Sequence, residues 1–286
     1  MTEREFMRYI DLFAGSGGLS LGLYNAGLHG IFAVEKNKDA FSTLKYNLIE
    51  RKNHFSWPNW LEMKNWDINE LLEVHSKELA ELNGSVDLVV GGPPCQGFSM
   101  AGKRKNNDIR NQLMHSYIEF IKLVQPTMLF FENVQGFTVG FKDHKDKQKY
   151  SDILVSELHE LGYNLEYKIV TMSEYGVPQN RKRFILFASK NGAYEIFFDE
   201  LLKNKDCFLR DRGLKIPITI SQAINDLKKS HGEVDSKDTK AFKNGKYGRA
   251  TSAYQKLMRN NIERCALPDS HRFVKHKSET IDLFKR

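Results

Sequence analysis

Short apolar runs alternate with helix-like segments through the first 190 residues, and this alternation restricts the fold more than any other feature of the chain. The apolar runs predict strands over residues 9–13, 30–34, 86–92, 128–131, 163–170 and 184–188. The segments between them predict helices over residues 19–27, 37–48, 71–82, 117–124 and 153–161. Such alternation indicates an α/β fold, in which helices cover both faces of a mostly parallel sheet.

The first predicted strand leads into a glycine loop, Gly15-Ser16-Gly17-Gly18. Glycines let the backbone turn sharply and approach a ligand closely, and the helix that follows offers free N–H groups. The spacing differs from the Gly-x-Gly-x-x-Gly fingerprint of dinucleotide-binding proteins. Glu35 ends the second strand, where an acidic side chain can accept hydrogen bonds from ribose hydroxyls. The alternative for Glu35 is a solvated charge at a strand end.

Two candidate catalytic residues follow predicted strands directly. Cys95 comes after Pro93 and Pro94, which restrict the backbone and present the thiol on a stiff loop. Open α/β sheets bind ligands at such strand ends, so Cys95 is a candidate nucleophile. The alternative is a small buried hydrophobic residue, the usual role of a free cysteine. Glu132 follows the fourth strand, where partial burial would favour its protonated form and suit it to proton donation.

Two basic segments lie near these residues in the sequence. Arg181 and Arg183 alternate at the start of the last predicted strand, so we expect their side chains to face the same side. The alternative for Arg181 is a clamp on a phosphate or a carboxylate. Residues 100–111 form a glycine-containing loop that is basic in its middle, which suits a lid that closes over a charged ligand.

Four of these segments, in this order, resemble motifs of the DNA (cytosine-5)-methyltransferases. Residues 11–19 resemble the family's S-adenosylmethionine loop, and residues 93–99 resemble its catalytic loop. Glu132-Asn133-Val134 resembles its cytosine-gripping motif, and residues 179–183 resemble its paired-arginine motif. The resemblance implies a Rossmann-like methyltransferase fold and S-adenosylmethionine as methyl donor, with S-adenosylhomocysteine as product and no metal. It also implies double-stranded DNA as substrate, with the target base flipped out of the helix.

The resemblance also assigns roles to individual residues. It implies that Cys95 adds to carbon 6 of cytosine, that Glu132 acts at ring nitrogen 3, that Arg183 contacts the carbonyl oxygen and that Arg181 lies near the nucleophile. The implied cofactor-binding residues are Phe13, Gly15, Ser16, Gly17, Gly18, Leu19, Glu35, Asp67, Ile68 and Pro93. The implied DNA-binding residues are Gln96, Ser99, Lys103, Arg104, Lys105 and Arg110. For Asp67 a helix N-cap remains an alternative.

Positive charge is concentrated at the end of the chain. Residues 206–286 contain 18 Lys and Arg against 10 Asp and Glu, whereas residues 1–205 contain 25 against 26. The last segment also contains apolar helical stretches at 220–227 and 254–259. We therefore divide the chain into a catalytic and cofactor-binding domain, 1–205, and a basic segment, 206–286, that begins a recognition or partner-binding region. The alternative is a merely solvated basic tail.

The chain shows no recognisable target-recognition region and no counterpart of the family's last two motifs. We therefore expect either one subunit of a split methyltransferase, with a second polypeptide as partner, or a truncated product. The three cysteines are widely spaced and no run of 18 apolar residues occurs, so we expect a cytoplasmic, metal-free protein. The resemblance to restriction–modification enzymes implies a bacterial, nucleoid-associated one. The predicted function is cytosine-5 methylation of DNA in restriction–modification. Methylation of transfer RNA, or an inactive binding subunit, remains an alternative.

Overall fold

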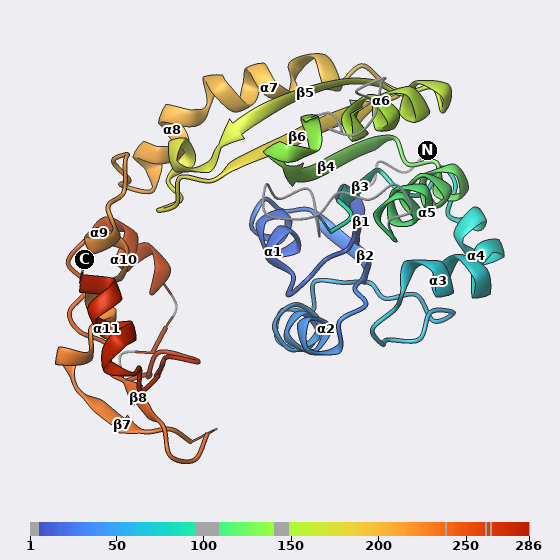
Figure 1. Ribbon diagram of the computed structural model, residues 1–286. Helices are drawn as coiled ribbons and strands as arrows, with labels where there is room; N and C mark the ends of the chain where they lie inside the picture. Colours follow the sequence, from blue (N-terminus) through green and yellow to red (C-terminus); the bar gives the residue numbers. More distant parts are fainter. Residues whose placement is uncertain are drawn as a thin grey trace. The chain divides into compact units, whose positions relative to one another are not determined.

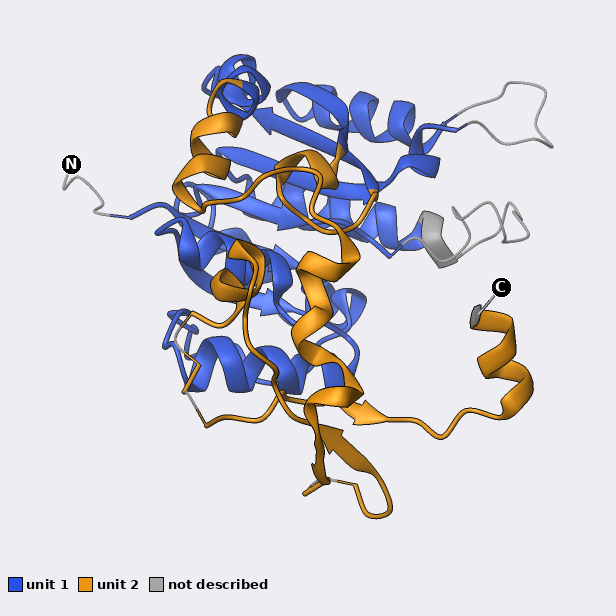
Figure 2. Cartoon of the chain, turned by 90° about the vertical axis from the view of Figure 1, so that its left-hand side faces the viewer, with its two compact units in different colours: residues 1–170, 182–202 blue, residues 171–181, 203–286 orange. Residues whose placement is uncertain are grey.

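The computed structural model describes residues 6–94, 109–139, 149–237, 239–260, 262–263 and 265–285. The chain forms two compact units, unit 1 of residues 1–170 and 182–202 and unit 2 of residues 171–181 and 203–286 (Figure 2). The proposed division of function at residue 205 is not tested by this and stays a prediction.

Unit 1 contains a six-stranded sheet with the order β2-β1-β3-β4-β6-β5 (Figure 1). Its strands are β1 (Arg8–Leu12), β2 (His29–Val34), β3 (Leu88–Gly91), β4 (Met128–Val134), β5 (Asn164–Thr171) and β6 (Lys182–Ser189). β1 pairs in parallel with β2 and β3, and β3 pairs in parallel with β4. β6 runs antiparallel to β4. The predicted α/β class and the mostly parallel sheet are confirmed.

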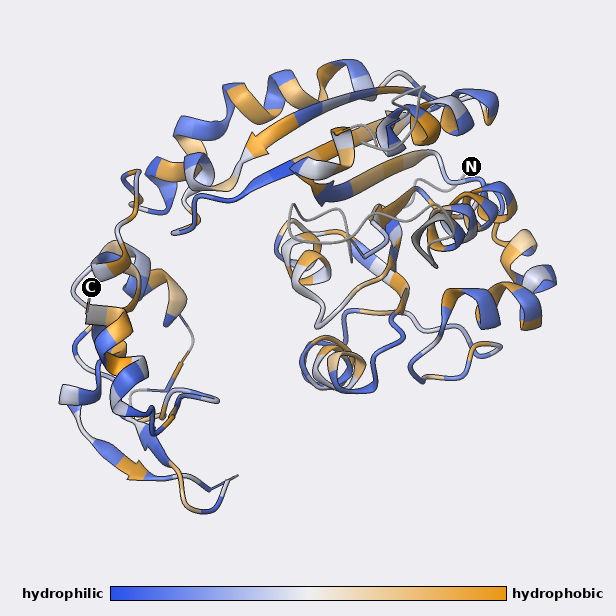
Figure 3. Cartoon of the chain, viewed as in Figure 1, coloured by the Kyte–Doolittle hydropathy of each residue, from blue (hydrophilic) through white to orange (hydrophobic). Residues whose placement is uncertain are grey.

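Helices cover both faces of this sheet. They are α1 (Gly18–Asn25), α2 (Lys38–Leu44), α3 (Ile68–Val74), α4 (Ser76–Glu81), α5 (Ile109–Val124), α6 (Tyr150–Glu160) and α7 (Tyr194–Lys203). Alternate residues of a strand point to opposite faces. On β3, Val89 packs with α3 to α6 in one core, whereas Leu88 and Val90 pack with α1, α2 and α7 in another. Figure 3 shows hydrophobic and hydrophilic residues mixed along α7, as expected of a helix with one buried side.

One predicted helix is wrong. The segment 71–82 forms two helices, α3 and α4, because the backbone of His75 leaves the helical region (φ −120°, ψ 25°). His75 therefore ends α3 and precedes α4.

Unit 2 combines short helices with a small antiparallel sheet. The helices are α8 (Lys205–Asp211), α9 (Ile220–Ile224), α10 (Ala253–Met258) and α11 (Ser278–Lys285). The strands are β7 (Glu233–Asp235), β8 (Lys243–Gly245) and β9 (Arg272–Phe273). Helices α9 and α10 lie in the two stretches of the basic segment that the sequence predicts as helical. None of the helices in the described part of the chain is long and apolar enough to cross a membrane.

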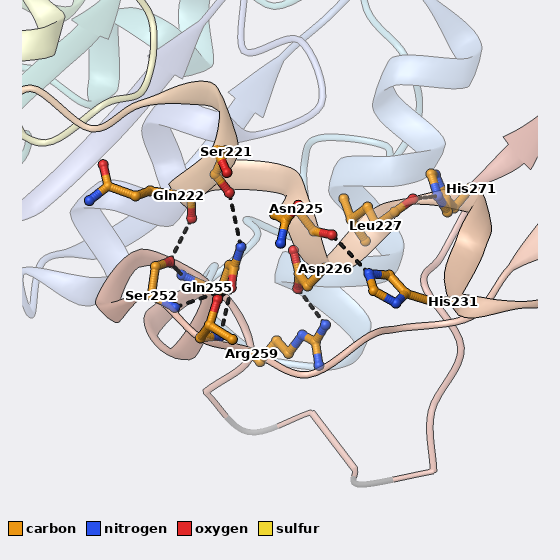
Figure 4. Close-up of polar contacts among 11 residues, drawn as sticks. Ser221, Gln222, Asn225, Asp226, Leu227, His231, Ser252, Gln255, Arg259 and His271 are labelled. Atoms are coloured by element: carbon orange, nitrogen blue, oxygen red, sulfur yellow. Dashed lines mark hydrogen bonds and ion pairs between the residues drawn. The ribbon is translucent and has the colours of Figure 1, made fainter.

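Polar side chains hold unit 2 together (Figure 4). The Oγ of Ser252 donates to the carbonyl of Gln222 at 2.5 Å, which joins α10 to α9. His231 and His271 donate ring N–H groups to the carbonyls of the turn that follows α9, at 2.9 and 2.7 Å. The buried Asp226 in that turn forms an ion pair with Arg259. The side chains of His231, His271 and Arg259 thus all hold this turn.

Candidate functional site

A cavity of about 720 Å³ lies at the carboxyl ends of β1, β2 and β3. Its walls come from the residues that follow these strands, from the loop before α3 and from Leu113 of α5. This is the edge at which parallel sheets bind ligands. The volume falls within the range of roughly 300–1,000 Å³ that is typical of small-molecule sites.

The glycine loop between β1 and α1 forms one wall in an unusual conformation. Phe13 and Gly15 both line the cavity and have positive φ angles, 59° and 56°. A bulky residue such as Phe13 rarely adopts this conformation, which is costly and is concentrated at functional sites. The strained turn brings the loop backbone to the cavity.

Glu35, at the end of β2, holds this loop in place. One carboxylate oxygen accepts a hydrogen bond from the N–H of Gly15 at 2.8 Å, and the other accepts one from the N–H of Asn37 at 2.6 Å. Asn37 in turn caps α2. A carboxylate has about four acceptor positions, so Glu35 retains acceptor capacity on the cavity side. The predicted contact with ribose hydroxyls fits this geometry but is not tested by it.

Asp11 lies beneath the loop and is 1% exposed. Its carboxylate accepts a hydrogen bond from the Oγ of Ser20, in the first turn of α1, at 2.5 Å. Burial raises the pKa of Asp11 to about 7, and the nearby charge of Glu35 also raises it. The hydrogen bonds from Ser20 lower the pKa but do not outweigh burial. Since the N-cap of α1 is Gly17, which has no side chain to cap the helix, Asp11 supplies a carboxylate near that helix end.

Asp67 takes the helix N-cap role that the sequence left open, and its contact with a cofactor stays a prediction. It is the N-cap of α3, accepting the N–H of Asn69 at 2.9 Å, and it also lines the cavity. Its second oxygen pairs with the Nζ of Lys36 at 2.6 Å. Burial opposes ionisation, but the hydrogen bonds and charge of Lys36 and the N–H of Asn69 outweigh it, so the pKa of Asp67 is lowered.

Five of the predicted cofactor-binding residues line the cavity: Phe13, Gly15, Glu35, Asp67 and Ile68. Five others do not belong to its lining: Ser16, Gly17, Gly18, Leu19 and Pro93. A Cβ at Gly17 would lie 2.7 Å from Leu48, so this glycine allows α1 and the helical turn after α2 to pack closely. Leu19 packs against the core on the same face. Cofactor contact by these five residues stays a prediction.

Sequence reasoning missed several residues of the cavity wall. These are Val34, Lys36, Asn37, Lys38, Trp66, Gly92, Pro94 and Leu113. Most of them are neighbours of predicted residues at strand ends, which is the signal that could have identified them. Leu113 comes from α5, and only tertiary packing brings it here. Within the described residues no group of three or more potential metal ligands occurs, and the expected lack of a metal stays a prediction.

The candidate catalytic acid lies beside this cavity. Glu132 and Asn133 belong to β4 itself, because this strand continues to Val134 rather than ending at residue 131. Glu132 forms an ion pair with Arg183 of β6, whose side chain is only 12% exposed. A Cβ at Gly92 would lie 2.1 Å from the carbonyl oxygen of Glu132, so only glycine allows the end of β3 to approach β4 this closely. The cavity wall and Glu132 are therefore adjacent.

Asn133 connects β4 to the loop of the candidate nucleophile. Its side chain is fully buried, and its Nδ2 donates to the carbonyl of Pro93 at 3.2 Å. This bond fixes the backbone two residues before Cys95. Sequence reasoning noted Asn133 only as part of a motif.

The remaining predicted residues are placed less completely. Cys95, Gln96, Ser99, Lys103, Arg104 and Lys105 lie outside the described residues, and Arg110 is described only as part of α5. The expectation that Arg181 and Arg183 share one strand is wrong, because β6 begins at Lys182. Arg181 precedes the strand, is exposed and belongs to unit 2, whereas Arg183 belongs to unit 1.

Comparisons with solved structures show the same fold. A solved E. coli structure, described as a prophage-encoded DNA modification methyltransferase, is 25% identical with a TM-score of 0.58, covering 98% of this chain and 69% of that one. S. pombe Dnmt2 methyltransferase has the same fold, with 23% identity, a TM-score of 0.52 and coverage of 70% and 56%.

Curated relatives point to the same family. Type II methyltransferase M.XorII of Xanthomonas oryzae is 35% identical over 189 residues, which is 64% of this chain and 40% of that protein. M1.HphI of Haemophilus parahaemolyticus is 34% identical over 68% of this chain and 48% of its own length. The chain thus spans about two-fifths to a half of the length of these relatives. The profile of the C-5 cytosine-specific DNA methylases matches residues 7–283. The chain belongs to the family of C-5 cytosine-specific DNA methylases.

Proposed function

We propose that this chain is the catalytic part of a DNA (cytosine-5)-methyltransferase of the restriction–modification type, which uses S-adenosylmethionine. The observation that carries the proposal is the adjacency of two sites at one sheet edge. Gly92 lines the cavity at the ends of β1, β2 and β3, and it also packs against the backbone carbonyl of Glu132 on β4. A methyl donor in the cavity and a cytosine at Glu132 are therefore neighbours.

The cavity residues suit an adenosyl group. S-adenosylmethionine supplies an electrophilic methyl group on a positively charged sulfur. The carboxylates of Glu35 and Asp67 offer acceptors for the hydroxyls and the amine of the adenosyl group. Phe13 and Ile68 provide apolar surface on which a purine ring can pack. The strained backbone at Phe13 supports a role in ligand contact.

The residues around Glu132 suit cytosine activation. Carbon 5 of cytosine is a weak nucleophile, and addition of the Cys95 thiolate to carbon 6 converts it into an enamine-like one. Glu132 assists this addition at ring nitrogen 3, and Arg183 holds the Glu132 carboxylate in place. Asn133 fixes the carbonyl of Pro93 and thereby the start of the Cys95 loop. A base inside a duplex cannot reach such a site, so the target base is flipped out.

We further propose that a second polypeptide supplies target-recognition elements and that the protein acts at cytoplasmic, nucleoid-associated DNA. Exposed apolar side chains of residues 206–286, among them Ile220, Ile224 and Met258, support the first part, because exposed apolar surface is typical of interaction sites. The basic excess of residues 206–286 supports contact with a polyanion.

Methyl transfer tests the proposed activity. The chain, alone and with the product of the adjacent reading frame, is incubated with tritiated S-adenosylmethionine and either duplex DNA or transfer RNA. We expect labelled 5-methylcytosine in the DNA. Label only in RNA would show that transfer RNA is the substrate. Absence of label from both nucleic acids in both preparations would contradict the proposal. Efficient methylation of one defined DNA sequence by the chain alone would contradict the need for a second polypeptide.

A further inference from the structure

Two contacts join the residues after β2 to the loop before α3, and both segments line the cavity. The Nζ of Lys36 pairs with Oδ2 of Asp67 at 2.6 Å, and the Nδ2 of Asn65 donates to the carbonyl of Lys36 at 3.0 Å. Lys36 follows β2, and Asp67 precedes α3. The Lys36 side chain is 79% exposed and that of Asp67 only 24%, so the ammonium lies on the solvent side of the pair. The two contacts thus tie together two parts of the cavity wall.

The Asp67 carboxylate is held at both oxygens. Oδ1 accepts the N–H of Asn69 at 2.9 Å and its side-chain amide at 3.1 Å. Oδ2 accepts from Lys36. The helix end alone would leave Oδ2 without a fixed partner in the described structure, so Lys36 determines where this oxygen lies. Since a carboxylate can accept about four hydrogen bonds, Asp67 can still accept one from a ligand in the cavity.

The pair also favours the charged form of Asp67. The hydrogen bond and charge of Asp67 raise the pKa of Lys36, and those of Lys36 help to lower the pKa of Asp67 against the effect of burial. The hydrogen bonds from Asn69 act in the same direction as Lys36. Loss of the ammonium would therefore raise the pKa of Asp67.

We propose that Lys36 is a positioning residue for the adenine subsite, which holds the Asp67 carboxylate aligned to accept a hydrogen bond from the exocyclic amine of the ring. This inference rests on the proposed function, because the ring is that of the cofactor. Lys36 does not need to touch the ligand. It acts through the oxygen that it fixes.

Lys77 provides a matched control. It is an exposed lysine of α4 that does not line the cavity, and it carries the same charge. In contrast to Lys36, it has no acidic partner among the residues that the structure describes. Lys77→Met therefore removes one positive charge from unit 1 without changing the cavity or Asp67.

Calorimetric binding of S-adenosylhomocysteine, which has no net charge at neutral pH, tests the inference. We expect Lys36→Met to weaken binding about fivefold at low salt, which is the upper end of what an exposed ion pair contributes. The difference in affinity between the variant and the wild type should shrink as salt rises. Lys36→Arg should restore affinity, and Lys77→Met should leave it unchanged. In an Asp67→Asn background, Lys36→Met should have no further effect, because the residue that Lys36 positions is already neutral.

The pH profile separates positioning from a merely structural role. Loss of Lys36 raises the pKa of Asp67, so affinity should begin to fall at a higher pH in Lys36→Met than in the wild type. Equal affinity and equal pH profiles in the two proteins would overturn the inference, as would tighter binding by Lys36→Met, which would mean that Lys36 competes with the ligand. Failure of the wild type to bind S-adenosylhomocysteine would overturn the proposed function as well.

Discussion

Asn133 joins β4 to the backbone that precedes Cys95. Its amide is buried and donates to the carbonyl of Pro93 at 3.2 Å. A buried carbonyl that loses its donor costs about 1–3 kcal/mol, and a small displacement of a reacting group can cost about a hundredfold in rate. We therefore expect Asn133 to affect the chemistry through the position of Cys95, which it does not touch.

We predict that Asn133→Ala slows methyl transfer roughly 10- to 100-fold while S-adenosylhomocysteine still binds. The reason is that the residues that line the cavity are left in place, whereas the Cys95 loop loses its attachment to β4. Rate and affinity are measured on the same preparation, by single-turnover methyl transfer and by calorimetry. Unchanged transfer would show that the bond to Pro93 has no positioning role.

At the scale of single elements, the six strands of the large sheet follow from their apolar runs, but the ends of those strands do not. β4 continues through Glu132 and Asn133 because it pairs with β6 along its whole length, a tertiary contact that no local pattern contains. β7, β8 and β9 have two or three residues each, too few for a period-2 pattern to be recognised. The position of Glu35 was predictable from a strand end, whereas the contacts of Lys36 with Asp67 and of Asn133 with Pro93 required the structure.

The junction of β1 and α1 should give the stability of this protein a characteristic pH dependence. Burial raises the pKa of Asp11 from 3.8 to about 7. The folded state therefore binds a proton more tightly than the unfolded state, and this stabilisation is present below pH 4 and is lost as pH rises to about 7.

We predict that Asp11→Asn unfolds at higher urea concentration than the wild type at pH 8, and that the difference becomes smaller at pH 5. The amide still accepts from Ser20 but carries no buried charge. Urea denaturation at the two pH values measures this. A variant that is less stable than the wild type at both values by the same amount would contradict the assignment of the charge to Asp11.

At the scale of the whole molecule, the excess of positive charge lies in one of the two units. Residues 206–286 carry this excess and belong to unit 2, whose secondary structure was predicted only in part from the sequence. Lys246 and Arg249 follow β8, are exposed and have no acidic partner among the described residues. Lys243 lies on β8 itself, and its Nζ is paired with a carboxylate oxygen of Asp235 at 2.5 Å.

We predict that Lys246→Met and Arg249→Met each weaken binding to non-specific duplex DNA and each lower the dependence of log affinity on log salt by about one unit. Lys243→Met should have a smaller effect, because its charge is already compensated. Fluorescence anisotropy at several salt concentrations gives both quantities. Equal effects of all three variants would mean that only total charge matters.

We predict that Cys95 attacks carbon 6 of a flipped cytosine, and trapping with 5-fluorocytosine tests this step. Fluorine at carbon 5 cannot leave as a proton does, so attack by the nucleophile produces a lasting covalent adduct after methyl transfer. With duplex DNA that contains 5-fluorocytosine and with S-adenosylmethionine, the wild type and a Cys207→Ser control should form an adduct that mass spectrometry maps to Cys95. Cys95→Ser should form none. An adduct on Cys207 or Cys265, or one that persists in Cys95→Ser, would show that Cys95 is not the nucleophile.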